Sequence, residues 1–564
     1  MKNSSKPFLP CLQTVLLLLA VFALYARSLH APFVFDDIEV FSNPENVAKY
    51  SHKIFSLNLR WLSYATFGWT ASWFGPDIFW FRLGNVMLHA ANAIALFFLL
   101  RRLFQVTLAG RDTPNDVPAS LAWFAFFGAL TFALHPVAVY GVAYLIQRST
   151  LMATLFVLLM LRVYLEGLLR GRWYWMLAAA LFYFAALYSK EHSILAPGVA
   201  LAMTFLIRKP SAALLKQIAP YIILLALLAA TVVYIVISKG LLGAAYEPNA
   251  IVMLFKSAQL QGVTDLPNIY LLSILTQSWL FFKYLGLWLL PNPAWMSVDM
   301  REPFAHSFFS VYALALLAFL LYGFLAIRFL FKRGRLGLLG FALLFPWLMF
   351  MTEFSTVRIQ EEFVLYRSYL WAVGGFALLP LIVWKITARG AMLMLGVVAA
   401  FMFVVSMERL STFSHPFLLW NDAEKLVHGR SDLPGEYRIY YNRGTEYLKL
   451  DRYDDAIRDL KYSLKLYGDQ PAAYGNLGAA YIKKGDFEDA LKTYNRAIQI
   501  GHDKKARIVP KHYLGRAMAN EALKNWAAAS ADYKVTCRLI HKGCDKTDLP
   551  HVPKRKQLHM GSKP

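Results

Sequence analysis

Polar and ionisable side chains stand at the ends of the long apolar runs of this 564-residue sequence. The residues that share this placement are Asp36, Asp37, His135, Gln147, Arg148, Lys190, Glu191, His192, Asp299, Arg358, Glu362 and Arg367. Ionisable groups at a membrane edge cost free energy, so we interpret them as functional candidates. Carboxylates beside several cations would supply a base for an incoming hydroxyl and fixed positive charge for a departing phosphate.

Each of these residues also has a structural alternative. Asp36 and Asp37 would suit the N-cap of a following helix, and because adjacent residues point in different directions, we expect only one of them to face a substrate. Lys190 and Glu191 would suit an ion pair. His89, inside an apolar run, is more often a hydrogen-bonding group between helices than a ligand. No group of His and carboxylates has metal-ligand spacing, so no metal is predicted.

The composition places most of the chain in lipid. The sequence has 58 basic and 35 acidic residues and a net charge of +23, yet only 16% of its residues are charged and 58% are hydrophobic. A nucleic-acid-binding or disordered chain carries far more charge and less apolar mass, so both classes are excluded. Three cysteines are too few for a disulfide scaffold.

Apolar runs long enough to cross a bilayer recur between Cys11 and Met407. We place eleven spans at residues 11–29, 78–100, 119–135, 150–167, 173–189, 193–207, 217–238, 308–327, 336–352, 363–384 and 391–407. A twelfth run, 269–290, is treated as re-entrant or interfacial, because the basic clusters between the other spans then all face the cytoplasm. This topology puts the C-terminus and the candidate residues outside.

The first run is interpreted as a membrane span, with a cleaved signal peptide as the less favoured alternative. No A-x-A cleavage site precedes Arg27. In both cases residues 30–77 form a long first external loop. This loop is rich in aromatic side chains, which favours helices that lie at the membrane interface.

From Glu436 the sequence repeats itself at a spacing of 34 residues. The matching pairs are Tyr440/Tyr474, Asn442/Asn476, Gly444/Gly478, Tyr447/Tyr481, Tyr453/Phe487, Asp455/Asp489 and Ala456/Ala490. This period is typical of tetratricopeptide repeats, in which small residues let paired helices approach. A looser third copy follows. Three stacked units would form a concave surface for a polypeptide; a rigid cap that only stabilises the membrane body is the alternative.

These patterns divide the chain into four parts. We predict a membrane domain over 1–407, a linker over 408–435, about three repeats over 436–545 and a basic disordered tail over 546–564. Cys537 and Cys544 are close enough in sequence for a disulfide in an oxidising compartment, with two unpaired thiols as the alternative.

Six segments, taken in order and followed by the repeats, carry a resemblance to a known family. They are Phe33–Asp37 with Asn43, Arg60–Ser63, Asn85–Ala90, His135-Pro136 with Gln147-Arg148, Ser189–Glu191 and Arg367–Leu370. The chain resembles the transmembrane and tetratricopeptide-repeat O-mannosyltransferases and their bacterial relatives, of the GT-C superfamily. The resemblance implies an all-α polytopic membrane bundle of GT-C type with external repeats. It also implies inverting transfer of a sugar from a polyprenyl-phosphate donor to Ser or Thr of an exported protein, for example a pilin.

The resemblance gives the candidate residues their expected roles. Asp36 would act as the general base, and Asp37 would orient the sugar or the loop. The residues expected to bind the donor phosphate are Lys190, Arg148, Arg367, Gln147 and His192. The supporting residues are Glu191, Arg60, His89, His135, Arg358, Glu362 and Asp299. No cofactor is predicted; the expected partners are the lipid-linked sugar donor, an acceptor polypeptide on the repeats and membrane lipids.

Other function classes stay open as alternatives. A GT-C enzyme that glycosylates a lipid or polysaccharide would not need a protein-binding arm, since a lipid acceptor arrives through the bilayer. A non-catalytic scaffold would not need the Asp pair, and a transporter places ionisable residues at mid-bilayer in paired halves. We expect a multi-pass protein of a bacterial inner membrane, with the site and the repeats on the periplasmic side.

Overall fold

The computed structural model of the chain describes residues 8–41, 44–50, 60–110, 117–245, 250–260, 266, 268–359, 361–383, 385–430, 433–503 and 509–540. The chain forms two compact units, Met1–Pro434 and Gly435–Pro564, which we describe separately. Helices dominate both units. Within the described ranges, the β-structure amounts to two isolated bridges, Ala245 with Val357 and Met300 with Phe363.

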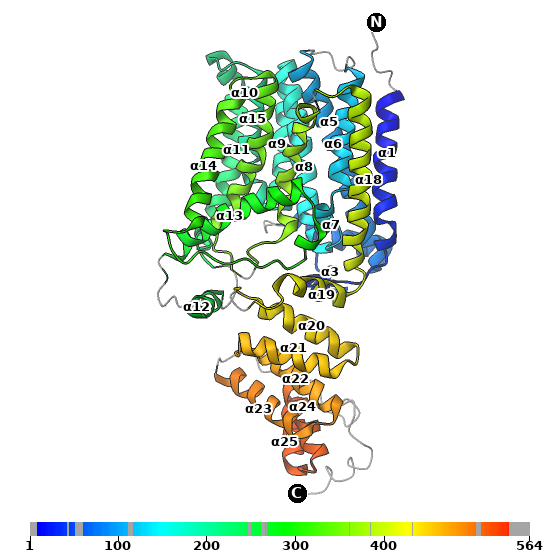
Figure 1. Cartoon of the computed structure of the whole chain (residues 1–564), viewed down its shortest axis with the longest axis vertical. Helices are drawn as coiled ribbons and strands as arrows, with labels where there is room; N and C mark the ends of the chain where they lie inside the picture. Colours follow the sequence, from blue (N-terminus) through cyan, green and yellow to red (C-terminus); the bar gives the residue numbers. More distant parts are fainter. Residues whose placement is uncertain are drawn as a thin grey trace. The chain divides into compact units, whose positions relative to one another are not determined.

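The first unit is a bundle of long apolar helices (Figure 1). They are α1 (Phe8–Tyr25), α5 (Ile78–Leu108), α6 (Ala119–Ala133), α8 (Arg148–Arg170), α9 (Trp173–Ser189), α10 (Ala196–Ile207), α11 (Ala212–Ser238), α13 (Ile269–Leu289), α14 (Val311–Leu330), α15 (Gly334–Phe350) and α18 (Ala388–Thr412). Shorter helices are α7 (Pro136–Val142), α12 (Ala250–Leu260), α16 (Ser368–Ala372) and α17 (Leu379–Ile382).

The helices account for the expected spans. Among the described residues, eight helical segments are long and apolar enough to cross a membrane, and the bent pair of α6 and α7 makes a ninth. Two shorter apolar segments, Trp173–Ser189 and Glu191–Ile207, complete the predicted set of eleven. The chain is therefore a multi-pass membrane protein.

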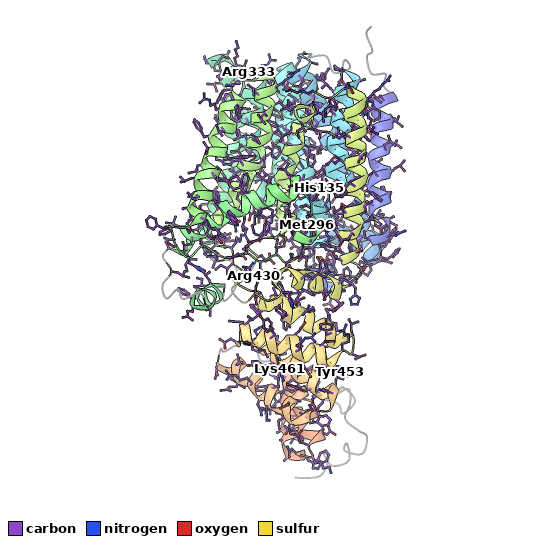
Figure 2. All side chains as sticks on the ribbon, viewed as in Figure 1. His135, Met296, Arg333, Arg430, Tyr453 and Lys461 are labelled. Carbon is purple, nitrogen blue, oxygen red and sulfur yellow. The ribbon has the colours of Figure 1, made fainter. Side chains whose placement is uncertain are left out.

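The candidate residues and the basic loops lie at opposite ends of the bundle. In Figure 1, α7 lies at one end with α3 (Pro44–Ala48) and α19 (Pro416–Val427). Figure 2 places His135 and Met296 toward this end and Arg333, in the loop between α14 and α15, at the other. We name the first the site end, formed by the described residues 29–41, 44–50, 60–77, 134–147, 190–195, 290–310, 351–359 and 361–367. The other is the basic end, formed by the C-terminal turns of α5 and α8 and the turns around residues 208 and 333.

Helix α13 runs across the bundle, whereas its neighbours run along it (Figure 1). Asn268 caps its N-terminus by accepting the backbone N–H groups of Tyr270 and Leu271 at 3.1 and 3.2 Å. Near its other end, the indole N–H of Trp288 donates to Ser368 Oγ at 2.9 Å. The segment 269–290 was expected to be re-entrant or interfacial, and among the described residues α13 is not one of the helices long and apolar enough to qualify as spans.

The described part of the segment 30–77 contains helices, as its aromatic content indicated. It holds α2 (Asp36–Phe41), α3 and α4 (Trp61–Phe74). Phe41 packs against the rings of Phe67 and Phe81, with centroids 4.8 and 4.9 Å apart. These contacts fix α2 against α4 and the start of α5.

The expectation of a linker over 408–435 is wrong. Helix α18 continues to Thr412, beyond the predicted end of the last span at 407, and α19 fills much of the remaining segment. The buried Arg409 joins the two helices, because its Nη1 donates to Asp422 Oδ2 at 2.9 Å and to the carbonyl of Met296 at 2.7 Å. The segment therefore belongs to the first unit.

The second unit consists of three helix pairs. The pairs are α20 (Tyr437–Lys449) with α21 (Tyr453–Leu466), α22 (Pro471–Lys484) with α23 (Phe487–Asp503), and α24 (Pro510–Ala522) with α25 (Trp526–Ile540). A Cβ atom on Gly444 would lie 2.9 Å from the Leu460 side chain, so glycine is what lets α20 approach α21. The all-helical membrane bundle and the repeats confirm the predicted fold class. Cys537 lies in α25, whereas Cys544 and the predicted tail lie outside the described residues.

Candidate functional site

The two adjacent aspartates at the site end face different ways. Asp36, the first residue of α2, is exposed, and its Oδ2 accepts the hydroxyl of Tyr144 at 2.9 Å. Asp37 is fully buried and accepts the backbone N–H groups of Leu145 and Ile146 at 3.2 and 3.0 Å. Burial raises the pKa of Asp37 to about 7, although the neighbouring Arg82 and the N–H groups oppose this. One carboxylate is therefore open to substrate, and the other holds the loop.

Arg82, on α5, anchors the segment that leads into α2. Its buried guanidinium donates to the carbonyls of Ala31, Pro32 and Ala143 at 2.8, 2.5 and 2.9 Å. These three bonds tie the first loop to the turn that precedes α8. The position of Asp36 thus depends on an arginine inside the second span.

The backbone immediately before Asp36 is strained. Phe35 has a φ of +52°, in the left-handed region that side chains other than glycine rarely adopt. Its ring contacts the rings of Tyr144 and Trp420, with centroids 5.4 and 4.8 Å apart. Such strain persists where surrounding contacts enforce it, and it often marks functional sites. Trp420 comes from α19, so the segment predicted as a linker forms one wall of the site.

Lys190 lies in the tight turn between α9 and α10. Its Nζ donates to Thr150 Oγ1 at 2.6 Å and to Gln147 Oε1 at 3.3 Å, and it lies 5.7 Å from the centre of the Tyr366 ring. Only 5% of the residue is exposed. Burial, and then the positive charge of Arg60, lower the pKa of Lys190 to about 7. Among the described residues Lys190 makes no ion pair, so its ammonium group is available to an anion.

A chain of alternating charges surrounds Lys190. Arg60 pairs with Glu191, His192 lies 3.4 Å from Glu191 and 3.5 Å from Glu353, and Glu353 pairs with Arg367 at 3.4 Å. Arg367 also donates to the carbonyl of Glu361 at 2.7 Å. The chain brings together three segments, 60, 190–192 and 353–367, that are far apart in sequence. The acidic and basic side chains of this chain of charges nearly balance, so the cations are held in place by several neighbours and not by one dominant counter-ion.

A small pocket opens among these residues. Its lining side chains are Thr150, Lys190, His192, Met349, Thr352, Arg367, Leu370 and Trp371. The lining combines cations and hydroxyls with apolar and aromatic side chains. This combination suits an amphiphilic anion, in which a charged group is joined to a hydrocarbon chain.

Two tyrosines connect Asp36 with Lys190. Tyr144 donates to Asp36, and its ring lies 5.9 Å from the ring of Tyr366, which in turn lies under the ammonium group of Lys190. The hydroxyl of Tyr366 donates to Glu361 Oε2 at 3.1 Å, which fixes the ring at its far end. A carboxylate and a cation are therefore linked through the contacts of one aromatic pair.

Arg148 and Gln147 are adjacent in sequence, but only Gln147 reaches Lys190. The guanidinium of Arg148 donates to Asn85 Oδ1 at 2.9 Å, to the carbonyl of Phe81 at 2.7 Å and to Thr66 Oγ1 at 3.3 Å. It also stacks on a ring of α4, 3.8 Å from the ring centre. These contacts use the side chain to join α4, α5 and α8, which assigns Arg148 to positioning these helices instead of binding the donor phosphate.

The two histidines expected as supporting residues form bonds between helices. His89 Nδ1 lies 2.6 Å from the hydroxyl of Tyr369, and its Nε2 lies 2.9 Å from the carbonyl of Ala133. His135 Nε2 lies 3.1 Å from the carbonyl of Trp288, and the two rings stack with centroids 4.2 Å apart. Both side chains are buried. For His89 this is the structural alternative that the sequence favoured.

Asp299 and Glu362 belong to a second buried cluster beside the charge chain. Arg301 pairs with Asp299 at 2.6 Å, and Glu362 Oε1 accepts the backbone N–H of Glu302 at 2.7 Å. Burial raises the pKa of Glu362 well above its usual range. The backbone N–H of Arg358 donates to Ser273 Oγ at 3.4 Å, and Gln277 Nε2 donates to the carbonyl of Glu362 at 3.3 Å. These two bonds tie α13 to Arg358 and Glu362.

The structure adds residues that the sequence did not single out. Glu353, Tyr144, Tyr366, Thr150 and Arg82 all contact predicted site residues. An available signal for Glu353 was its position, since it is an acid at the end of an apolar run. Tyr144 and Tyr366 carried no such signal, because tyrosine is common near membrane surfaces.

In the part of the chain that the structure describes, no group of three or more His, Cys, Asp or Glu side chains is placed to hold a metal ion. The acidic residues of the site instead face arginines, histidine or backbone N–H groups.

Comparisons with known proteins support the repeats most directly. Residues 441–505 match the family model of the tetratricopeptide repeat, which confirms the predicted period over α20 to α23. Two solved structures of the arabinofuranosyltransferase AftD from Mycobacteria, the protein and a single-residue mutant, align with TM-scores of 0.34 and 0.37. Each is 14% identical over 76% of this chain, which spans 29–30% of the length of AftD. No curated protein matches this chain.

Proposed function

We propose that this chain is a membrane glycosyltransferase of GT-C type that moves a sugar from a polyprenyl-phosphate donor to a Ser or Thr hydroxyl of an exported protein. The observation that carries the proposal is the arrangement of Asp36 and the cationic pocket at one end of a membrane bundle. Asp36 is exposed and accepts the hydroxyl of Tyr144, whose ring neighbours that of Tyr366, and the ammonium group of Lys190 lies over the Tyr366 ring. Displacement at an anomeric carbon needs a base and a leaving-group site on opposite sides of the sugar.

Asp36 is proposed to accept the proton of the acceptor hydroxyl. The hydroxyl oxygen forms the new bond to the anomeric carbon, and its proton passes to the Asp36 carboxylate. An alcohol is a much weaker acid than a carboxylic acid, so the proton moves late, when the new bond has largely formed. The hydrogen bond from Tyr144 fixes the carboxylate without neutralising it.

Lys190, Arg367 and His192 are proposed to stabilise the leaving phosphate, with Gln147 holding the ammonium group of Lys190 in place. The bond between the anomeric carbon and the phosphate oxygen breaks, and its electron pair remains on that oxygen. Because Lys190 is buried, its charge acts in a medium of low dielectric constant and stabilises the new negative charge strongly. Attack opposite the leaving group inverts the anomeric centre.

The repeats are proposed to hold the acceptor polypeptide. A tethered binding surface raises the local concentration of a weakly bound chain and so favours transfer to protein over transfer to lipid. We further propose that the site end faces the periplasm of a bacterial inner membrane. The basic end would then face the cytoplasm, in agreement with the positive-inside rule.

The proposal is tested by the products that cells release. Intact masses of exported proteins and of extracted lipids are measured in cells with the wild-type chain and in cells with Asp36→Asn. We expect sugar-sized mass additions on exported protein in the first cells and their loss in the second. Additions found on lipid instead would contradict the protein acceptor, and unchanged additions with Asp36→Asn would contradict the assigned base.

A further inference from the structure

One residue that lines the pocket at the site end, Trp371, has a buried indole N–H that nothing in the described residues satisfies. Two buried polar side-chain atoms without a hydrogen-bond partner belong to residues that line the pocket, His192 Nδ1 and Trp371 Nε1. His192 still lies within 3.5 Å of Glu191 and Glu353. The indole N–H of Trp371 has no comparable acceptor in that part of the chain, although the residue is only 2% exposed.

Aromatic packing holds the Trp371 ring in place. Its centroid lies 5.3 Å from that of Tyr284, 5.6 Å from that of Phe350 and 6.4 Å from that of Phe281, and the first two rings are nearly perpendicular to it. A ring so enclosed cannot turn to find an acceptor elsewhere. Burying an N–H without an acceptor costs free energy, so the acceptor is expected from a ligand.

In other tryptophans of the bundle, the indole N–H donates a hydrogen bond to an acceptor in the protein. The indole N–H of Trp288 donates to Ser368 Oγ, and that of Trp347 donates to the carbonyl of Phe319, both at 2.9 Å. Trp61 and Trp175 share the lack of a partner, but they do not line the pocket. Trp371 differs from these tryptophans in two respects taken together: its indole N–H has no acceptor among the described residues, and it lines the pocket that Lys190 and Arg367 also line.

We infer that Trp371 is a further donor-binding residue, whose indole N–H donates a hydrogen bond to the phosphate group of the lipid-linked sugar. The inference rests on the proposed function and names an additional contact in the same site. Charges attract an anion from any direction, whereas a neutral N–H selects one oxygen and so fixes its orientation. Met349 and Leu370 line the pocket as well, so the recognised anion is a phosphate joined to a hydrocarbon chain rather than a free phosphate.

The competing explanation is a weak contact of the N–H with the perpendicular rings of Tyr284 or Phe350. Under that explanation the N–H contributes to packing alone. Replacing Trp371 by phenylalanine separates the two, because phenylalanine keeps an aromatic ring and removes the N–H. Trp347→Phe is the matched control, since it removes an indole N–H that donates to a backbone carbonyl outside the pocket.

The experiment measures binding to the full-length protein in lipid nanodiscs. The probes are farnesyl phosphate, farnesol and inorganic phosphate, and thermal unfolding of each variant is recorded. We expect Trp371→Phe to weaken farnesyl phosphate binding about tenfold and to leave farnesol binding unchanged. Trp347→Phe should bind all three probes as the wild type does.

Each other outcome overturns a stated part of the inference. Equal affinity of Trp371→Phe and wild type for farnesyl phosphate overturns the role of Trp371 and leaves the proposed function standing. Equal affinity of the wild type for farnesyl phosphate and farnesol contradicts the proposed donor class. Inorganic phosphate that binds as tightly as farnesyl phosphate overturns the lipid-linked ligand.

A measurement on the wild type keeps the inference testable where Trp371→Phe does not fold. With tryptophan labelled by ¹⁵N in the indole, one N–H resonance should move downfield when farnesyl phosphate is added and stay in place with farnesol. If every indole resonance stays in place with both compounds, the inference is wrong.

Discussion

The two ends of the membrane bundle use charge in opposite ways. At the basic end, the single carboxylate of Glu166 accepts hydrogen bonds from Arg102, Arg162 and Arg170 at 3.0, 2.6 and 2.8 Å. At the site end, Lys190 donates to the uncharged oxygens of Thr150 and Gln147. The first arrangement uses a carboxylate to bind several cations together. The second arrangement places a cation beside a pocket and leaves the charge of that cation uncompensated at close range.

This difference separates structural charge from functional charge. A charge group with all its partners in the protein stabilises the fold, and removing a partner lowers the free energy of unfolding. A buried cation that faces a pocket contributes little until a ligand arrives, and then contributes to binding and turnover. Substitutions at the two ends should therefore affect different measurements.

The largest effect is expected from Asp36→Asn. The amide keeps the size of the side chain but accepts no proton from the acceptor, so turnover should fall by about a thousandfold. Transfer to an acceptor peptide is measured with the full-length protein in nanodiscs. Asp36 is exposed, so the unfolding temperature should stay unchanged. Turnover within a few-fold of wild type would show that Asp36 is not the base.

Lys190→Met should lower turnover by about a hundredfold, because the leaving phosphate loses one buried positive charge. The contrasting variant is Glu166→Gln at the basic end. It removes the charge of the carboxylate that Arg102, Arg162 and Arg170 share, so it should lower the unfolding temperature and leave turnover unchanged. Equal turnover losses in both variants would mean that the two ends do not differ as described.

Asp37→Asn should act on stability. The amide cannot accept both N–H groups of Leu145 and Ile146, so unfolding should become easier by about 1–3 kcal/mol. Burial raises the pKa of Asp37 to about 7, above its value of 3.8 in the unfolded chain. The folded state therefore binds the proton more tightly, and wild-type stability should fall as the pH rises from about 4 to about 7. Denaturation across this range should show that slope in the wild type and its loss in Asp37→Asn.

The smallest effect is expected from Lys190→Arg at low pH. The pKa of Lys190 is lowered to about 7, so the ammonium charge is present below that pH and lost above it. Wild-type affinity for farnesyl phosphate should therefore decline as the pH rises from 6 to 8. Arginine stays charged across this range, so Lys190→Arg should bind about equally at both ends of it. A flat wild-type profile would contradict the role of the Lys190 charge.

The sequence predicted the fold well because its signals are local. The apolar runs gave the spans, and the 34-residue period gave the repeats over α20 to α23. The error over 408–435 has a physical cause. Arg409 lies near the end of an apolar run, and the sequence does not show that Asp422 and the Met296 carbonyl satisfy it.

The site was predicted less completely because its contacts are long-range. Glu353 meets His192, and Tyr144 meets Asp36, across more than a hundred positions. Arg148 shows a second limit, because successive residues at the start of a helix point about 100° apart. Gln147 therefore turns toward Lys190 while Arg148 turns toward α4 and α5.

The turn between α9 and α10 carries Lys190, Glu191 and His192 on three successive positions. A cation, a carboxylate and an imidazole thus enter the site on a single hairpin. Exchanging residues 173–207 between homologous chains would transfer all three groups together, while Asp36 and Arg367 stayed with the recipient. The hairpin is therefore a natural module for recombination, and chimaeras at its ends offer a direct way to move donor preference from one enzyme to another.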